Sequence, residues 1–411
     1  MSQQGPVIIV SDTENAALAE TIGDAKLFPL IDSNWPDATQ AVARVQPAAV
    51  IAANSQFHQN LLAELARQVE SLKPYAVLIV IDPASPLPPN AIPFTHIQHG
   101  DPSRLTARLN AALRIRTLHA TVLRRIRESS LLQAQWPMND PLDDANVLLI
   151  GRGASYPSLS VALGERMGVI GALSIEAAAK HLNTRDIDGI VVGEGFSARV
   201  VDAFLTVLAE DSRFRNLPVI LTGDVPTRNY DLPNIERACG MPLDIAINAV
   251  PLIRKNAFEA RLNRVLKSID AGGLLDPHTG LMTQEAFKND FTKTLDDTLE
   301  RGAALSIARL ALPNISDRTR FEAARILSRL MRRMDFATLR DDDSIIVAFA
   351  ETEIRNARMI AQRLASILRQ TVFSKRDRRL NPDVSLATLL PNDSVDSILK
   401  RLESSGKPAA H

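Results

Sequence analysis

Val7-Ile8-Ile9-Val10 is a run of four aliphatic residues near the start of the 411-residue chain, and it decides the fold class of the first third. Two further apolar runs follow at residues 48–53 and 76–81, with an amphipathic helical pattern at residues 59–72 between them. Continuously apolar strands that alternate with helices are typical of a parallel sheet covered on both faces. The sequence therefore predicts a doubly wound α/β domain.

The same pattern starts again about 140 residues further along the chain, which indicates an internal duplication. The second set of expected strands lies at residues 146–150, 187–192 and 217–222. A helical pattern at residues 254–269 resembles the longer one at residues 104–133, which we expect to close the first copy.

Proline and glycine mark the expected domain boundaries. Two prolines within Trp136–Pro141 oppose a continuous helix, and Gly272-Gly273 marks a second break. We therefore expect one domain over residues 1–135, a second over residues 142–271, and a third over residues 272–404 that mixes helices with strands.

Composition narrows the class of protein. Lys+Arg and Asp+Glu both number 47, so the formal net charge is zero and gives no bulk attraction to nucleic acid or to an anionic membrane. Cys239 is the only cysteine, which excludes an internal disulfide and a cysteine-based metal cluster. No apolar run is long enough to span a bilayer, and the first ten residues lack the pattern of a signal peptide. We expect a cytoplasmic protein with no nucleic-acid partner.

Three short motifs in the third domain carry a family resemblance. Asp276-Pro277-His278-Thr279-Gly280-Leu281-Met282-Thr283-Gln284-Glu285-Ala286-Phe287 resembles the Asp-x-Leu-Thr-Gly-Leu-x-Asn-Arg-Arg-x-Phe motif that opens GGDEF domains. Asp341-Asp342-Asp343-Ser344-Ile345 stands where the GGDEF hairpin belongs and leads into an apolar strand at residues 344–349. Arg332-Arg333-Met334-Asp335 lies five residues earlier, at the spacing of the Arg-x-x-Asp allosteric site of diguanylate cyclases.

The order of the domains is similar to that of PleD/PopA-like response regulators, in which two receiver domains precede a GGDEF domain. The resemblance is specific in the third domain and architectural in the first two. It implies two flavodoxin-like doubly wound receiver domains and a C-terminal α+β GGDEF domain of the nucleotidyl-cyclase-like fold.

The resemblance also indicates that the cyclase reaction is lost. A diguanylate cyclase condenses two GTP molecules, and carboxylates must hold metal ions on the phosphates. The family's first metal-binding Asp aligns with Arg309, a cation that repels the metal. Asp341 and Asp342 replace two glycines that let the backbone approach the nucleotide, and their charges repel GTP.

Further positions depart from the cyclase pattern. Asp343 keeps the third signature position, but Ser344 replaces the acid after it, Thr283 stands in place of the motif's Asn, and the segment that reads guanine is shortened around residues 313–320. We therefore expect no catalytic residue, no metal site and no required cofactor. The alternatives are a new metal site in residues 341–343, or a residual cyclase that depends on Asp343.

The charged residues of the allosteric site are all present: Arg332, Asp335 and, by counting without gaps from Ser344, Arg363. A guanidinium donates in parallel to guanine O6 and N7 or to phosphate oxygens, and a carboxylate accepts from guanine N–H groups. The resemblance thus implies cyclic di-GMP as the ligand. The alternative is an ion pair between Arg332 and Asp335, which would be neighbours on a helix.

Neither receiver-like domain has the residues for phosphoryl transfer, which needs an acidic pair, an acceptor Asp and a conserved Lys. The acceptor position falls on Ala53 in the first domain and on Gly193 in the second. The acidic pair aligns with Ser11-Asp12 and with Gly151-Arg152, and the Lys position of the second domain aligns with Asn248.

The sequence lacks the residues that the GGDEF family uses for catalysis but keeps those of its allosteric site, and this contrast indicates the expected function. The third domain would bind cyclic di-GMP, and the receiver-like domains would support a homodimer and dock protein partners in bacterial signalling, cell-cycle control or regulated proteolysis. Recruitment to a cell pole follows by analogy. A scaffold that works without a ligand is the alternative.

Overall fold

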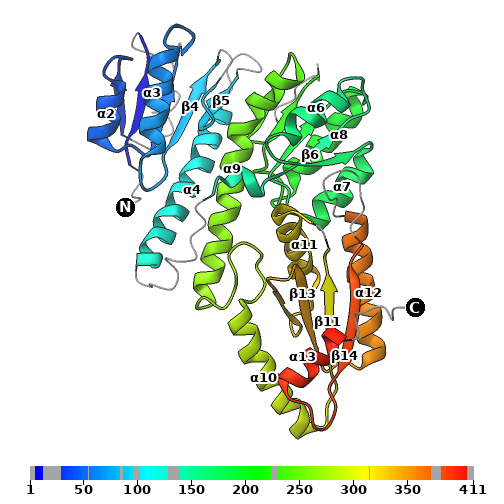
Figure 1. Ribbon diagram of the computed structural model, residues 1–411. Coiled ribbons are helices and arrows are strands. Elements are labelled where there is room, and N and C mark those ends of the chain that lie inside the picture. The colour runs from blue at the N-terminus through cyan, green and yellow to red at the C-terminus, as the bar shows by residue number, and fades with distance from the viewer. Residues whose placement is uncertain are drawn as a thin grey trace. The chain divides into compact units, whose positions relative to one another are not determined.

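The computed structural model describes residues 5–12, 29–53, 55–83, 87–95, 102–127, 139–223, 230–313, 315–371 and 381–404 (Figure 1). The chain forms two compact units. The first comprises residues 1–128, 138–183 and 187–263, and the second comprises residues 129–137, 184–186 and 264–411. No helix in the described ranges is long and apolar enough to cross a membrane.

The first sheet is parallel and has the strand order β2-β1-β3-β4-β5. Alternate residues of β1 point to opposite faces: Val7 and Ile9 join one buried cluster, and Ile8 and Val10 join the other. Burial on both faces explains the continuously apolar run, and the doubly wound prediction is confirmed. The strands are β1 (Val7–Val10), β2 (Leu30–Ser33), β3 (Ala49–Ala52), β4 (Val77–Ile81) and β5 (Ala91–Phe94).

Helices cover both faces of this sheet. The cluster that contains Ile8 includes residues of α2 (Ala38–Val45) and α3 (Gln59–Glu70), and the short helix η1 (Ser55–Phe57) precedes α3. The other cluster includes residues of α4 (Pro102–Arg127). The described part of α4 ends at Arg127, so residues 128–133 of the predicted helix lie outside the described residues.

The second sheet is also parallel, with the order β10-β9-β8-β6-β7. Numbered within each copy, both sheets have the order 2-1-3-4-5, which is the flavodoxin-like order. The duplication expected from the sequence is therefore present as topology. The strands are β6 (Asn146–Ile150), β7 (Gly168–Ala172), β8 (Gly189–Val192), β9 (Val219–Leu221) and β10 (Ile235–Arg237).

Helices cover both faces of the second sheet. One face packs against α7 (Ile175–Thr184) and α8 (Ala198–Glu210), and the other packs against α6 (Tyr156–Gly164) and α9 (Pro242–Asp270). The short helix η2 (Pro141–Asp144) comes just before β6. The prediction that the closing helix starts at residue 254 was wrong, because α9 starts at Pro242 and contains Pro251. Leu252 and Ile253 are fully buried, and their packing outweighs the hydrogen bond that Pro251 removes.

The two sheets of the first unit are joined by buried charges. Glu236 on β10 lies 3.4 Å from the Arg104 guanidinium and also pairs with Arg108, and both arginines come from α4. Arg108 is fully buried and donates to the carbonyls of Pro233 and Ile235 at 2.8 and 2.9 Å. The closing helix of the first copy is thereby fixed to the last strand of the second copy.

The second unit contains an antiparallel sheet of order β12-β13-β11-β14, as the α+β prediction requires. Ile345, Val347 and Phe349 pack in one core with α11 and α12, and Ile346 and Ala348 pack in the other with α10 and α13. The elements are α10 (Gln284–Arg301), β11 (Leu305–Ala311), α11 (Asp317–Leu330), β12 (Phe336–Leu339), β13 (Ser344–Ala350), α12 (Ile354–Thr371), β14 (Asp383–Thr388) and α13 (Val395–Ser404).

Candidate functional site

The acidic hairpin, residues 341–343, connects β12 to β13 at the position predicted for the GGDEF signature. The Arg340 N–H donates to the Ser344 carbonyl at 2.8 Å and closes the turn. Asp343 has φ 59°, a left-handed conformation that favours glycine but that Asp tolerates. The sequence thus keeps a tight turn here with carboxylates in place of glycines.

Each carboxylate of the acidic hairpin has a partner from another element. Gln284 donates to Asp341 at 3.0 Å, and Arg309 on β11 lies 3.1 Å from Asp342. Arg320 in the first turn of α11 lies 2.8 Å from the third carboxylate, that of Asp343, and 3.0 Å from Asp317. The negative charge of the hairpin is therefore opposed by two guanidinium groups.

Asp342 is the most strongly engaged of the three. Burial raises the pKa of its carboxyl, but hydrogen bonds from Ser344 and Arg309 and the positive charge of Arg309 outweigh burial, so the pKa lies below its usual value. Within the described residues, no group of three or more His, Cys, Asp or Glu side chains is placed to hold a metal ion. The alternative of a new metal site at residues 341–343 gains no support from this geometry.

The segment predicted to be shortened, residues 313–320, includes the start of α11. Helix α11 begins at Asp317, and the Ser316 hydroxyl accepts from the Thr319 N–H as an N-cap. The early start of α11 brings Arg320 to the acidic hairpin. The Arg320 guanidinium therefore lies beside the hairpin, in contact with the carboxylate of Asp343.

The allosteric turn, residues 332–335, lies between the end of α11 at Leu330 and the start of β12. The Asp335 N–H donates to the Arg332 carbonyl at 3.1 Å, so these residues form a turn and do not share a helix. No ion pair within 4.0 Å joins Arg332 to Asp335 in the described part of the chain. The helical ion pair considered as an alternative was therefore wrong.

Asp335 is 8% exposed, and its Oδ1 atom is buried without a hydrogen-bond partner among the described residues. Burial raises the pKa of this carboxyl, although the Arg332 charge and the N–H groups of Arg332 and Ala350 act in the opposite direction. Arg332 itself is exposed. A guanine that donates N–H groups to Asp335 would satisfy a carboxylate that the fold leaves under-bonded.

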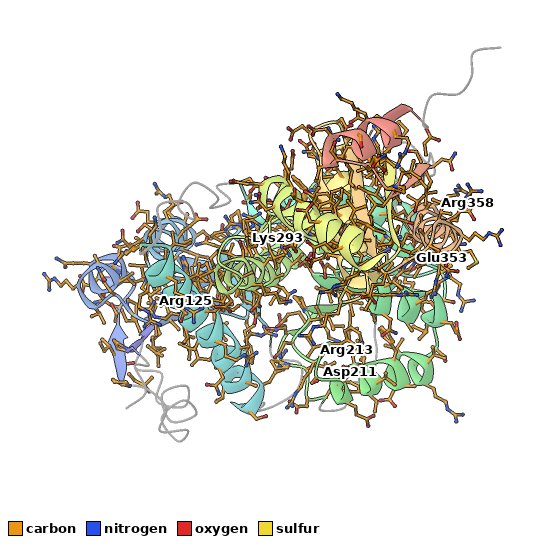
Figure 2. All side chains as sticks on the ribbon, turned by 90° about the horizontal axis from the view of Figure 1, so that it is seen from below. Arg125, Asp211, Arg213, Lys293, Glu353 and Arg358 are labelled. Carbon is orange, nitrogen blue, oxygen red and sulfur yellow. The ribbon has the colours of Figure 1, made fainter. Side chains whose placement is uncertain are left out.

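Arg363 lies on the exposed side of α12, whose buried side carries Ala357, Ala361 and Leu364. It is nine residues past Ile354, about 13 Å along the helix axis. Figure 2 shows Arg358, also exposed on α12, extending away from the ribbon. Because α11 and α12 pack in the same core, the allosteric turn and Arg363 belong to one face of the sheet.

The allosteric turn and the acidic hairpin lie at opposite ends of β12. Four strand residues separate them, about 13 Å of extended chain. The two motifs are therefore separated along the strand and do not overlap.

In the first parallel sheet, an indole packs against the residue predicted to align with the phosphoacceptor. Ala53 follows β3 and is 5% exposed, and its carbonyl accepts from Trp35 Nε1 at 3.1 Å. Trp35 stacks on His58 with ring centres 5.1 Å apart, and His58 Nε2 lies 2.6 Å from Asp12 Oδ1. Sequence reasoning missed Trp35 and His58, because their proximity to Ala53 depends on how the segments after β2 and β3 pack.

In the second parallel sheet, Gly193 follows β8, and its N–H donates to the Ile150 carbonyl at 2.7 Å. Arg152 follows β6 at the predicted acidic position, and its guanidinium lies over the Phe196 ring. The alignment of the Lys position with Asn248 was wrong, because β10 ends at Arg237 and Asn248 lies within α9. Ala238 follows β10 instead.

Comparisons with known proteins find structural similarity to GGDEF domains. No family model and no curated protein matches the chain. The GGDEF domain of DgcB from Caulobacter crescentus, solved in complex with c-di-GMP, is 14% identical over 32% of this chain and 84% of its own, with a TM-score of 0.30. The active GGEEF domain of a diguanylate cyclase from Vibrio cholerae is 13% identical over 31% and 88%, with a TM-score of 0.29. The GGDEF domain of FimX from Pseudomonas aeruginosa is 15% identical over 32% and 91%, also with a TM-score of 0.29.

Proposed function

We propose that the third domain is a GGDEF-type domain that binds cyclic di-GMP at Arg332, Asp335 and Arg363 and does not condense GTP. The observation that carries this proposal is the contrast between the two ends of β12. At one end, Arg309 and Arg320 pair with two carboxylates of the acidic hairpin; at the other end, Arg332 is exposed. Arg363 is exposed on α12, on the same face of the sheet.

The case against catalysis rests on charge and geometry. A divalent metal at the hairpin would have to displace Arg309 from Asp342 and Arg320 from Asp343, since ligand carboxylates must be free to coordinate. Arg309 would then lie beside the metal and repel it. Without metal, the charge that develops on the α-phosphate of GTP is not neutralised, so phosphoryl transfer lacks its main source of stabilisation.

Two exposed guanidinium groups, Arg332 in the allosteric turn and Arg363 on α12, and the buried carboxylate of Asp335 support binding. A charge-assisted hydrogen bond contributes about 1.5–3 kcal/mol net. Three or four such contacts from Arg332, Asp335 and Arg363 supply about 8 kcal/mol, which corresponds to micromolar affinity. Arginine also stacks on purine faces, which adds to recognition of guanine.

We assign the two parallel-sheet domains, as degenerate receivers, the role of homodimerisation and docking of protein partners in an effector. A second candidate function, a scaffold that needs no ligand, is favoured by an apolar stripe on α8. Val200 and Val207 are 42% and 60% exposed there, and Ala203 between them is also exposed.

Calorimetric titration of cyclic di-GMP into the full chain tests the proposal. Saturable binding at micromolar concentration is expected, with loss in Arg332→Ala and in Arg363→Ala and retention in the adjacent control Arg333→Ala. A parallel incubation with GTP and Mg²⁺ is expected to give no cyclic di-GMP. Absence of binding by the wild-type chain would leave the scaffold, and turnover of GTP would overturn the assignment as an inactive domain.

A further inference from the structure

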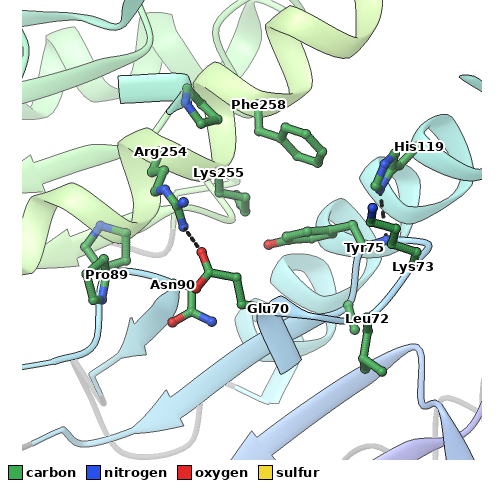
Figure 3. Close-up of a pocket in the computed structure, with 13 residues that line it drawn as sticks. Glu70, Leu72, Lys73, Tyr75, Pro89, Asn90, His119, Arg254, Lys255 and Phe258 are labelled. Carbon is green, nitrogen blue, oxygen red and sulfur yellow. Dashed lines mark hydrogen bonds and ion pairs between the residues drawn. The ribbon is translucent and has the colours of Figure 1, made fainter. Parts of the chain in front are cut away.

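A pocket of about 210 Å³ lies between the two parallel-sheet domains of the first unit (Figure 3). One wall comes from the segments around α3, β4 and β5 and from α4, and the other comes from η2 and α9. Its lining is mainly apolar and includes Leu72, Pro89, Pro141, Pro251 and Phe258. Proline and aromatic walls lose little conformational freedom when a ligand binds.

Three aromatic rings form the rigid part of the pocket. The ring centres of Tyr75 and Phe258 lie 5.5 Å apart, and His119 meets Phe258 edge-on at 5.2 Å. The Tyr75 N–H donates to His119 Nδ1 at 3.0 Å, and Arg116 donates to the Tyr75 carbonyl at 3.1 Å. Burial lowers the pKa of His119 to about 4, so the ring is neutral at pH 7. These contacts fix three rings from different segments in tilted and edge-on arrangements around the pocket.

The Tyr75 hydroxyl supplies a polar group on this surface. It has no hydrogen-bond partner within the described residues, and Figure 3 shows it directed into the space between Glu70 and Lys255. Burial raises the pKa of Tyr75, so the hydroxyl stays protonated and acts as a donor at neutral pH. An acceptor atom on a ligand would satisfy it.

The basic side chains of the pocket differ in how far carboxylates compensate them. Arg254 pairs with Glu70 at 2.9 Å and with Asp140 at 3.1 Å, so its charge is already compensated. Lys73 and Lys255 remain as basic side chains of the lining. Lys255 is 5% exposed, and its ammonium donates to the neutral Asn234 Oδ1 at 2.8 Å, with no carboxylate within 4.0 Å among the described residues. Burial and the positive charge of Arg108 lower the pKa of Lys255 to about 7, whereas the charge of Glu259 raises it. A carboxylate brought into the pocket would raise this pKa further and stabilise the charged ammonium.

We propose that this pocket binds a small aromatic monocarboxylate, with the ring against Phe258 and the carboxylate near the Tyr75 hydroxyl. A cavity of about 150 Å³ accommodates benzene, so 210 Å³ leaves room for one ring and a short acidic side chain. Both domains line the site, so the ligand stabilises their association. This proposal is independent of cyclic di-GMP binding, since every lining residue belongs to the first unit.

Calorimetric titration of the full chain with phenylacetate, and with phenylacetamide as a neutral isostere, tests the proposal. Phenylacetate is expected to saturate with a dissociation constant of about 0.1 mM, and the amide to bind at least about tenfold more weakly. Tyr75→Phe is expected to weaken phenylacetate about fivefold. The control Tyr230→Phe, at a tyrosine whose hydroxyl bonds Asp202 at 2.6 Å, should leave affinity unchanged.

Three results would overturn the proposal: no binding of either compound up to about 10 mM, equal binding of the acid and the amide, or equal affinity in Tyr75→Phe and wild type. Hydrogen exchange of the wild type provides a second readout that does not depend on variant folding. Phenylacetate should protect residues 72–76 and 254–258, and protection only elsewhere would place the ligand outside this pocket. Cyclic di-GMP binding, measured in parallel, should not change with phenylacetate.

Discussion

Replacement of Glu236 by Gln removes a negative charge that two buried arginines of α4 share. The carboxylate accepts from Arg104 at 3.4 Å, from Arg108, and from the Thr95 N–H at 3.2 Å. Glutamine keeps one acceptor oxygen and the volume of the side chain, so packing is preserved while Arg108, fully buried, loses its counter-charge. Loss of one partner of a buried ion pair costs about 3–5 kcal/mol, and we expect the lower end for Gln.

Urea unfolding monitored by far-UV circular dichroism measures this cost. With a denaturant slope of about 3 kcal/mol per molar, a loss of about 3 kcal/mol lowers the midpoint of the first unit by about 1 M. The exposed Glu165→Gln is the matched control and should shift the midpoint by less than about 0.2 M. A midpoint for Glu236→Gln equal to that of the control would refute the view that this charge cluster holds the two parallel-sheet domains together.

Three further predictions concern the second unit. Phe349→Ala, at a fully buried position, should lower the free energy of unfolding by about 3–5 kcal/mol, whereas the exposed Met359→Ala should change it by less than about 0.5 kcal/mol in the same urea titration. The folded-state pKa of Asp335 is raised, so its charged form opposes folding. Asp335→Asn should therefore melt no lower than wild type at pH 7.5, and any stability gain should shrink as the pH falls towards the carboxyl's ordinary pKa of about 4; a lower melting temperature at pH 7.5 would contradict this. The pKa of Asp342 is depressed, so its contribution to stability is present at neutral pH and lost on acidification. Asp342→Asn should melt lower than wild type at pH 7, and the difference should shrink as the pH falls below about 4; equal melting at pH 7 would show that the Arg309 contact has no energetic effect.

The sequence allowed prediction of those strands that are buried on both faces. The apolar runs that became β1, β3, β4, β6 and β8 were recognised, since alternate residues enter two cores. Strand β2, at the sheet edge, is mostly half-buried and contains an exposed residue, so it lacks this signal. Strand β7 begins with a glycine and alternates in exposure, and it was missed for the same reason.

Some features of the candidate sites could be predicted from the sequence, and others could not. The motif spacing predicted two separate sites, and residues 332–335 and 341–343 do lie in two turns that flank β12, because position along the chain fixes position in space for short turns. The ion pairs of Arg309 and Arg320 were not predicted, because they depend on the pairing of β11 with β13 and on where α11 begins. The pocket around Tyr75 was also missed, since it combines residues 70–90 and His119 of the first domain with Pro141 and residues 251–258 of the second.

Hydrogen–deuterium exchange of the full chain with and without cyclic di-GMP tests the central claim most directly, because it locates the ligand in the wild-type protein. The account predicts protection of the allosteric turn at residues 332–335 and of α12 around Arg363, with no change at the acidic hairpin, residues 341–343. Protection at the hairpin alone, or no protection in the second unit at saturating ligand, would contradict it.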